Sequence, residues 1–465
     1  MEEILNGYKV GNATWLYLSF FLIVAIYFRF SRIFTLRNSD LLMLLAISPG
    51  ILLAKNGSAS GYVWLFVVCS VWMLRLIFDG YFTRRPRLEQ NLNTPGLTFL
   101  CAVAFVFLSI HGWTSKELPA STVQTVEAAD RLLKLQEAPA KSAHSPDEAK
   151  AGPAAAVLTA PIVPIVKAMP SLAPSNNTEP KTAGTAPTTM TAVYAARLAS
   201  IIAHLLVIAA LVCIGRWQFG DQQIGMAMGA LYMLLPCTSY DVGRLNHVLP
   251  AAFILWAIAS YRRPILAGGL MALACGTLFF PVFLLPLWFL FYDRRGAVRF
   301  GAGLAAVGIA LAGSLVLTSA DTTSFINQMI GAVIDWPALS FRANDVSGGF
   351  WTPEIKAYRI PVFVAFCAGT IVISIWPRQK TLENLIANSG AIIVGTQFWY
   401  PQQGGVYSLW YVPLLLVVIF RPTLSHLLPP EFARRAATQQ PANAPAAPEL
   451  VGSGGPINGA AARLG

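Results

Sequence analysis

Long apolar runs dominate this chain and limit what it can fold into. Several are about 17 to 25 residues long, the length that an α-helix needs to cross the hydrocarbon core of a bilayer. Inside that core every backbone polar group needs a protein partner, and these runs are too long and too continuous for the strands of a barrel. Only 12% of the residues are charged, against about 25% in soluble domains. The sequence therefore predicts an all-α, polytopic integral membrane protein.

The runs predict about twelve or thirteen transmembrane helices. The predicted spans lie at about 15–34, 39–55, 62–79, 96–113, 192–214, 223–238, 247–261, 264–292, 299–318, 359–376, 382–400 and 406–421. Residues 264–292 leave two alternatives open. Basic residues flank both ends, and the stretch Gly276 to Pro281 can turn the chain back between two short helices, since proline cannot donate to a helix. A single tilted helix would instead invert the topology of everything that follows.

The basic residues lie in short clusters beside the apolar runs, which is typical of topology signals on the cytoplasmic side. They place the loops 29–40 and 79–95 in the cytoplasm and the N-terminus outside. The net charge of +11 is explained by these clusters, so we expect no nucleic-acid partner. We expect the protein in a bacterial inner (cytoplasmic) membrane.

Metal and nucleotide chemistry are not indicated. The six cysteines are scattered without a CxxC pair, which supports neither a zinc site nor a disulfide framework. Walker, GxGxxG, HExxH and DxD motifs are absent from the sequence. We therefore expect no metal and no cofactor.

Composition divides the chain into four parts. Residues 1–113 form an N-terminal four-helix membrane segment, and residues 191–421 form a larger membrane domain. Residues 114–190 are rich in Ala, Pro, Thr and Ser, which predicts a disordered linker outside the membrane, with room for a short interfacial helix at 121–136. The Pro-, Ala- and Gly-rich residues 422–465 predict a disordered cytoplasmic tail.

Three polar residues near the spans have ordinary interpretations. His204 lies alone in a span and is predicted to be a hydrogen-bonded packing residue. Arg75, near Asp79, is predicted to extend its side chain to the inner surface. Asp40 has the position of a helix start on the cytoplasmic side.

Other polar residues gather on the predicted outer side, where polar groups at membrane helices often mark a functional site. Asp241 and Asp345 are the candidate catalytic residues, because a carboxylate can act as a general base on an acceptor hydroxyl. The candidate substrate-binding residues are Arg244, Asn246, His247, Trp351, Tyr400, Gln402 and Tyr407. The alternative is that these are loop residues, with Asp241 capping a helix or pairing with Arg244, and the aromatic residues forming an interfacial belt.

Two segments carry a resemblance to a known family. Residues 241–300 begin with Asp241-Val-Gly-Arg-Leu-Asn-His and continue through an apolar span, an Arg doublet at 262–263 and the helix start Ile265-Leu-Ala-Gly-Gly-Leu. Residues 397–413 contain a proline, a tyrosine and a proline at 401, 407 and 413. Over about 190–421 the chain resembles the polyprenyl-phosphate-mannose-dependent, bacterial mannosyltransferase-like branch of the GT-C glycosyltransferases. Arg244 stands where that family favours Gln, the 276–281 turn lacks the family's lysine, and the family's early outer-loop Asp is missing.

The resemblance implies a GT-C-like fold and a membrane glycosyltransferase, a hexosyltransferase that moves a sugar from a polyprenyl-phosphate donor to a lipid or cell-envelope acceptor. Its partners would be membrane lipid and the donor, with Asp345 or Asp241 as base and Arg244 near the donor phosphate. The alternative is a non-catalytic scaffold or lipid-binding envelope protein with a GT-C-like shape. A transporter ranks third, because no internal repeat is evident. An enzyme would place Asp241, Arg244, Asp345 and Tyr400 around one outer pocket, whereas a scaffold would leave them apart.

Overall fold

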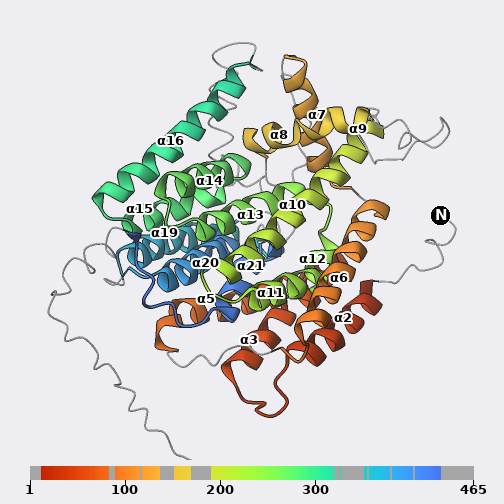
Figure 1. Cartoon of the computed structure of the whole chain (residues 1–465), viewed down its shortest axis with the longest axis vertical. Coiled ribbons are helices and arrows are strands. Elements are labelled where there is room, and N and C mark those ends of the chain that lie inside the picture. The colour runs from red at the N-terminus through yellow and green to blue at the C-terminus, as the bar shows by residue number, and fades with distance from the viewer. Residues whose placement is uncertain are drawn as a thin grey trace, which may run out of the picture.

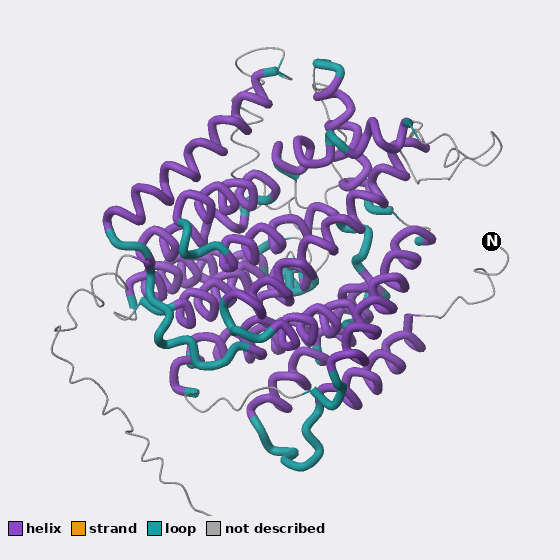
Figure 2. Tube along the Cα trace, in the orientation of Figure 1, coloured by secondary structure: helices purple, strands orange, loops and turns teal. Residues whose placement is uncertain are grey.

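The computed structural model of the protein describes most of the chain. The described residues are 12–82, 90–115, 118–136, 151–168, 190–317, 319, 325, 350–352, 355–376, 380–401 and 404–430. Within these residues all regular structure is helical and no strand is present (Figure 2). The all-α part of the prediction is therefore confirmed for the described chain.

The helices follow the apolar runs closely. The first part contains α2 (Asn12–Tyr27), α3 (Leu36–Leu45), α4 (Ile47–Lys55), α5 (Ala59–Ile77), the 3₁₀ turn η1 (Asp79–Tyr81), α6 (Thr94–Thr114), α7 (Ala120–Leu133), α8 (Pro153–Thr159) and α9 (Ile162–Lys167). The second part contains α10 (Met190–Trp217), α11 (Gln222–Leu234), α12 (Pro236–Tyr240), α13 (Leu245–Ala259), α14 (Pro264–Thr277), η3 (Phe280–Leu284), α15 (Leu285–Phe291), α16 (Arg294–Val316), η5 (Lys356–Tyr358), α19 (Arg359–Ile375), α20 (Leu382–Trp399) and α21 (Ser408–Phe420).

Five described helical stretches are long and apolar enough to cross a membrane. They are Leu36–Lys55, Ala59–Ile77, Thr94–Thr114, Met190–Trp217 and Arg294–Val316. Seven other apolar helical stretches of the described chain are shorter, at 10–17 residues. By length and composition the described residues therefore support fewer crossings than the twelve or thirteen predicted. α16 is the least covered of the five, with 17% of its most apolar window buried. Its outward residues include Val298 and Ile309, which are 68% and 73% exposed.

The predicted span 39–55 is interrupted. α3 ends at Leu45 and α4 begins at Ile47. Pro49 accounts for this break, because a proline in a helix has no N–H to donate and its ring collides with the carbonyl four residues earlier, which here belongs to Leu45.

Residues 264–292 form two helices that double back. α14 and α16 run parallel, since Gly268 meets the Phe300 carbonyl while Gly276 meets the Leu311 side chain further along both helices. The hydroxyl of Tyr292, just after α15, donates to the carbonyl of Tyr261, just before α14, at 2.8 Å. The segment therefore leaves on the side where it enters, which is the hairpin alternative. Gly268 permits the approach of α14 to α16 because the Phe300 carbonyl leaves no room for a Cβ.

The predicted linker 114–190 contains packed helices in its described parts. α7, α8 and α9 lie together at one end of the bundle, beside the start of α10 (Figure 1). Their small core comprises Val123, Val126, Ala129, Ala160, Val163 and Val166, joined by Ala192, Ala195 and Ala196. The composition argument missed this core because alanine and valine at helical spacing can pack closely even where proline and threonine are frequent nearby. Residues 137–150 and 169–189 of the predicted linker lie outside the described residues.

The N-terminal helices are not a separate unit. α5 packs against α20 and α6 against α11, and residues of both predicted membrane parts belong to one core. The Tyr27 hydroxyl donates to the Ala227 carbonyl at 2.9 Å.

At the other end of the chain, residues 422–430 differ from the predicted tail. They fold back onto α20, where the Leu382 N–H donates to the Leu427 carbonyl at 2.8 Å. Residues 431–465 lie outside the described residues.

Candidate functional site

The turn between α12 and α13 places the first candidate residues. Three side chains hold its carbonyls in position: the Thr122 hydroxyl donates to Gly243 O at 3.0 Å, the Ser200 hydroxyl donates to the same oxygen at 3.2 Å, and His204 Nε2 lies 3.1 Å from Val242 O. His204 Nδ1 lies 2.8 Å from the Tyr232 hydroxyl. Both ring nitrogens are therefore occupied, so the predicted packing role of His204 is confirmed, and its contact fixes the turn that carries Asp241.

Asp241 lies between two cations in what we name the Asp241 cluster: Lys55, Asp241 and Arg244. Asp241 Oδ1 is 2.6 Å from Lys55 Nζ and 3.1 Å from Arg244 Nε. The carboxylate side chain is 4% exposed, whereas the Lys55 and Arg244 side chains are 30% and 19% exposed. Lys55 Nζ also donates to the Tyr240 carbonyl at 2.7 Å. Within the described residues, the carboxylate of Asp241 therefore lies against two cations.

The two cations determine the protonation state of Asp241. Burial opposes ionisation and raises the pKa, but the charges of Arg244 and Lys55, together with the Lys55 hydrogen bond, outweigh it and hold the pKa of Asp241 below its ordinary value. The carboxylate is therefore ionised at neutral pH and already occupied. It is a counterion to the cluster rather than a base awaiting a proton, and this agrees with the alternative that Asp241 pairs with Arg244.

Four parallel rings form a second feature beside this turn, which we name the aromatic stack: Phe280, Trp410, Tyr407 and His247. Ring centroids are 4.4 Å apart for Phe280 and Trp410, 4.5 Å for Trp410 and Tyr407, and 5.1 Å for Tyr407 and His247, with interplanar angles of 16°, 8° and 7°. Trp410 Nε1 donates to His247 Nδ1 at 2.8 Å. An Nδ1 that accepts leaves the proton of the neutral imidazole on Nε2. The stack is buried.

The other predicted substrate-binding residues have different positions. Asn246 binds α7: its Oδ1 accepts from the Thr125 hydroxyl at 3.1 Å and its Nδ2 donates to Ser121 O at 3.3 Å. Trp351 is buried and its Nε1 donates to Phe398 O at 2.9 Å. Asp345 and Gln402 lie outside the described residues.

Tyr400 is also buried and extends the aromatic stack. Its ring stacks on Phe279 with centroids 5.0 Å apart, and it meets Tyr407 edge-on at 5.4 Å. The structure thus brings together Asp241 with Arg244, and His247 with Tyr400 and Tyr407. Asn246 does not join these residues, because its side-chain amide is hydrogen-bonded to α7.

The sequence analysis did not predict Lys55, Trp410 or Phe280 as part of this region. Lys55 comes from the end of α4, nearly two hundred positions from Asp241, and no local pattern links the two. Trp410 lies in an apolar helix, where a tryptophan is usually a core residue. A signal existed for Lys55 alone, since a lysine at the outer end of a predicted span needs an anion or water near it.

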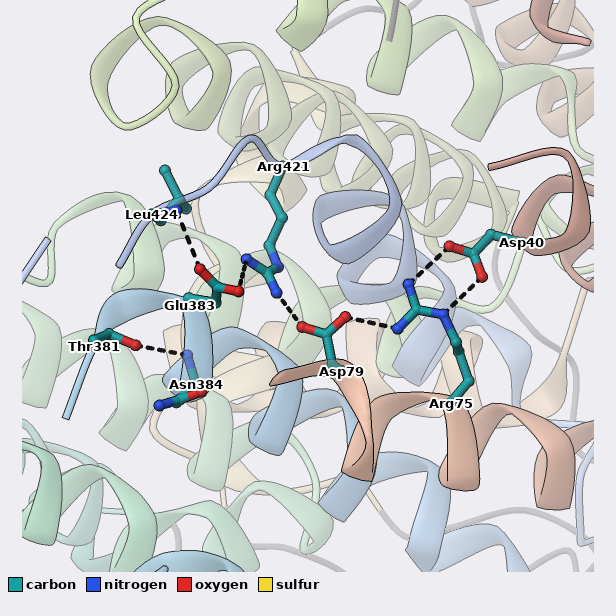
Figure 3. Close-up of polar contacts among 8 residues, drawn as sticks. All are labelled: Asp40, Arg75, Asp79, Thr381, Glu383, Asn384, Arg421 and Leu424. Atoms are coloured by element: carbon teal, nitrogen blue, oxygen red, sulfur yellow. Dashed lines mark hydrogen bonds and ion pairs between the residues drawn. The ribbon is translucent and has the colours of Figure 1, made fainter. Parts of the chain in front are cut away.

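A buried ion network lies at the opposite end of the same helices. We name as the ion network the residues Asp40, Arg75, Asp79, Glu383 and Arg421. Arg75 holds Asp40 through two hydrogen bonds of 2.9 Å, from Nε and Nη2, and its Nη1 donates to Asp79 Oδ1 at 2.6 Å. Figure 3 shows Asp79 between Arg75 and Arg421, bonded to both guanidinium groups.

The network continues into the C-terminal helices. Arg421 Nη1 is 2.7 Å from Glu383 Oε1, and Glu383 Oε2 accepts from the Leu424 N–H at 3.1 Å. The side chains of Arg421 and Asp79 are 0% and 2% exposed. Among these five residues, three carboxylates thus lie against two guanidinium groups.

The ion network corrects the prediction for Arg75. Its side chain is 6% exposed and turns inward to two carboxylates instead of extending to the surface. Asp40 is likewise buried, in the first turns of α3, and does not cap that helix; Thr35 is the cap, with its hydroxyl accepting from Asn38 N. The physical reason is that Asp40 and Asp79 together offset the desolvation of a guanidinium group, which a single i,i+4 partner does not.

Metal ligands do not cluster in the described residues: no group of three His, Cys, Asp or Glu side chains there could hold an ion. In comparisons with known proteins, no protein family, no curated protein and no solved structure matches the chain.

Proposed function

We propose that the protein is a polytopic protein of a bacterial inner membrane, with the Asp241 cluster outside and the ion network at the cytoplasmic surface. α5 runs from the neighbourhood of Lys55 to Arg75, and its 19 residues span about 28 Å at 1.5 Å per residue. That length is close to the roughly 30 Å of a hydrocarbon core. The exposed apolar faces of α5 and α16 between the two ends support this placement.

Within that membrane, the function that the geometry supports best is a GT-C-like glycosyltransferase. It transfers a sugar from a polyprenyl-phosphate donor to a lipid or cell-envelope acceptor. The observation that carries the proposal is the pair of partly exposed cations, Lys55 and Arg244, that converge on one buried carboxylate at the predicted outer surface. A donor phosphate is the anion that such a pair of cations binds well.

We assign different roles to the candidate residues. Lys55 and Arg244 bind the donor phosphate, and Asp241 holds both cations in place from beneath. Since Asp241 is already occupied by these cations, the general base that deprotonates the acceptor hydroxyl is assigned to Asp345. Direct displacement at the anomeric carbon, with inversion, follows from one base and one bound leaving-group phosphate.

The experiment is transfer of radiolabelled mannose from polyprenyl-phosphate mannose in membranes that contain the protein. Lys55→Met removes a charge-assisted contact worth about 1.5–3 kcal/mol, so we expect at least about tenfold slower transfer. Asp345→Asn should abolish transfer without lowering the amount of folded protein. Arg295→Gln, an exposed charge at the other end of the bundle, is the matched control and should transfer at the wild-type rate. Wild-type rates in both Lys55→Met and Asp345→Asn would refute these assignments.

A second candidate is a non-catalytic scaffold or lipid-binding envelope protein. The burial of the aromatic stack and of Tyr400 favours it, because buried rings cannot stack on a sugar. On this alternative the wild-type membranes transfer no sugar from any polyprenyl-phosphate donor, while Trp410→Phe and Lys55→Met lower the melting temperature.

A further inference from the structure

A half-open groove lies between α15, α19 and α20, near the predicted cytoplasmic surface. About 270 Å³ of the groove and the solvent at its open mouth is not filled by protein atoms. One wall is apolar, with Leu287, Leu290 and Ile373. The other wall is polar and carries Lys380 and Asn384.

Apolar side chains in and beside the groove are exposed. Leu290 lines the groove and is 41% exposed, and Ile375 and Trp376 at the end of α19 are 64% and 70% exposed. In a membrane this surface faces acyl chains, and a tryptophan at its edge is typical of the headgroup level. The groove therefore joins a hydrocarbon-facing surface to a polar pocket at the depth of lipid headgroups.

The charge in the groove is not neutralised by the ion network next to it. Glu383 is the nearest carboxylate along α20, and its two oxygens contact Arg421 and the Leu424 N–H (Figure 3). Among the described residues Lys380 has no ion pair. Partial burial lowers the pKa of Lys380 from its ordinary value, so an anion in the groove would offset the loss of hydration of its ammonium group.

The geometry points to a binding site for one anionic phospholipid of the inner leaflet. Its phosphate contacts the Lys380 ammonium and the second N–H of the Asn388 amide, whose first N–H donates to the Ile373 carbonyl at 3.4 Å. The first part of one acyl chain lies along Leu287, Leu290 and Ile373. Charge complementarity selects an anionic headgroup, and the inner leaflet is where basic pockets between membrane helices meet such lipids. This inference rests on the proposed membrane placement but not on glycosyl transfer.

The test uses the full-length protein in nanodiscs of equal parts phosphatidylglycerol and phosphatidylcholine. The protein is released into mild detergent, and native mass spectrometry counts the lipids that stay bound. We expect one retained phosphatidylglycerol per chain. Lys380→Gln should lower its retention about fivefold, the effect of one basic residue at an anionic surface. Leu290→Trp fills the groove without changing its charge and should lower retention as well.

Arg295→Gln is the matched control, because it removes an exposed positive charge near the same surface but outside the groove, and it should retain phosphatidylglycerol as the wild type does. Equal retention by Lys380→Gln and the wild type would overturn the site. An equal loss in Arg295→Gln would show only a general attraction to the membrane surface. Displacement of the lipid by inorganic phosphate would overturn the lipid and leave a phosphate site.

Discussion

The ion network and the Asp241 cluster lie at opposite ends of the same helices and are built in opposite ways. In the network, the arginines are 6% and 0% exposed and contact three carboxylates. In the Asp241 cluster the carboxylate is buried, and the cations are more numerous and partly exposed. Buried arginines that bind carboxylates from several helices hold those helices together. Partly exposed cations that a buried carboxylate holds in place can bind an anion from the solvent and release it again.

The largest expected effect comes from Asp79→Asn, which removes the carboxylate shared by Arg75 and Arg421. Removing one partner of a buried ion pair leaves uncompensated charge and destabilises by about 3–5 kcal/mol. Thermal unfolding in detergent should show a large drop in melting temperature, while Arg295→Gln, an exposed charge, should leave it unchanged. A melting temperature like that of the wild type would show that the network does not join the two parts of the chain.

A smaller effect is expected from Asp241→Asn, because Lys55 and Arg244 can reach water when their carboxylate is lost. We expect a destabilisation of about 1–2 kcal/mol at pH 7. Since the folded pKa of Asp241 is depressed, its contribution is present above the unfolded pKa of about 3.9 and is lost as the pH falls through the folded value. Unfolding measured from pH 7 downwards should therefore show the difference between wild type and variant shrinking below about pH 4. A difference that stays constant with pH would contradict the ion pairing.

The smallest effect is expected at Asp130, which pairs with Lys134 at 2.7 Å and Lys167 at 2.5 Å and is 27% exposed. These contacts lower the pKa of Asp130, but exposed ion pairs contribute little once solvent screens them. Asp130→Asn should cost about 0.5 kcal/mol or less. Hydrogen exchange of α9 would detect any loosening of its contact with α7, and a loss as large as that of Asp79→Asn would overturn the distinction between buried and exposed pairs.

Much of the fold follows from the sequence, because long apolar runs have few alternatives to helices. The hairpin at 264–292 was one of two alternatives, and the turn chemistry around Pro281 together with the basic flanks favoured the form that the structure has. Pro49 in the sequence indicates a break in the predicted span 39–55, but the break at Ala46 was not predicted. The short helix predicted at 121–136 is present as α7, whereas the helices within 153–167 were not predicted, because composition measures how many residues can pack and not which face they share.

The polar sites followed the sequence only where partners are close along the chain. Asp241 and Arg244 are three residues apart, and their pairing was one of the alternatives. Lys55, Glu383 and Arg421 join their partners from distant helices, and tertiary packing alone determines those contacts. The inward orientation of the Arg75 side chain could not be predicted. It depends on a second carboxylate, that of Asp40, which only the tertiary packing brings next to Arg75.

The most direct test of the central claim is native mass spectrometry of the protein purified from its membrane in mild detergent, with a search for bound polyprenyl phosphate or its sugar adduct. The account predicts such a molecule on the wild type, and its loss in Lys55→Met but not in Asp79→Asn protein that remains folded. If only bulk phospholipid accompanies the wild type, the Asp241 cluster does not bind a lipid-linked donor, and the glycosyltransferase proposal is contradicted.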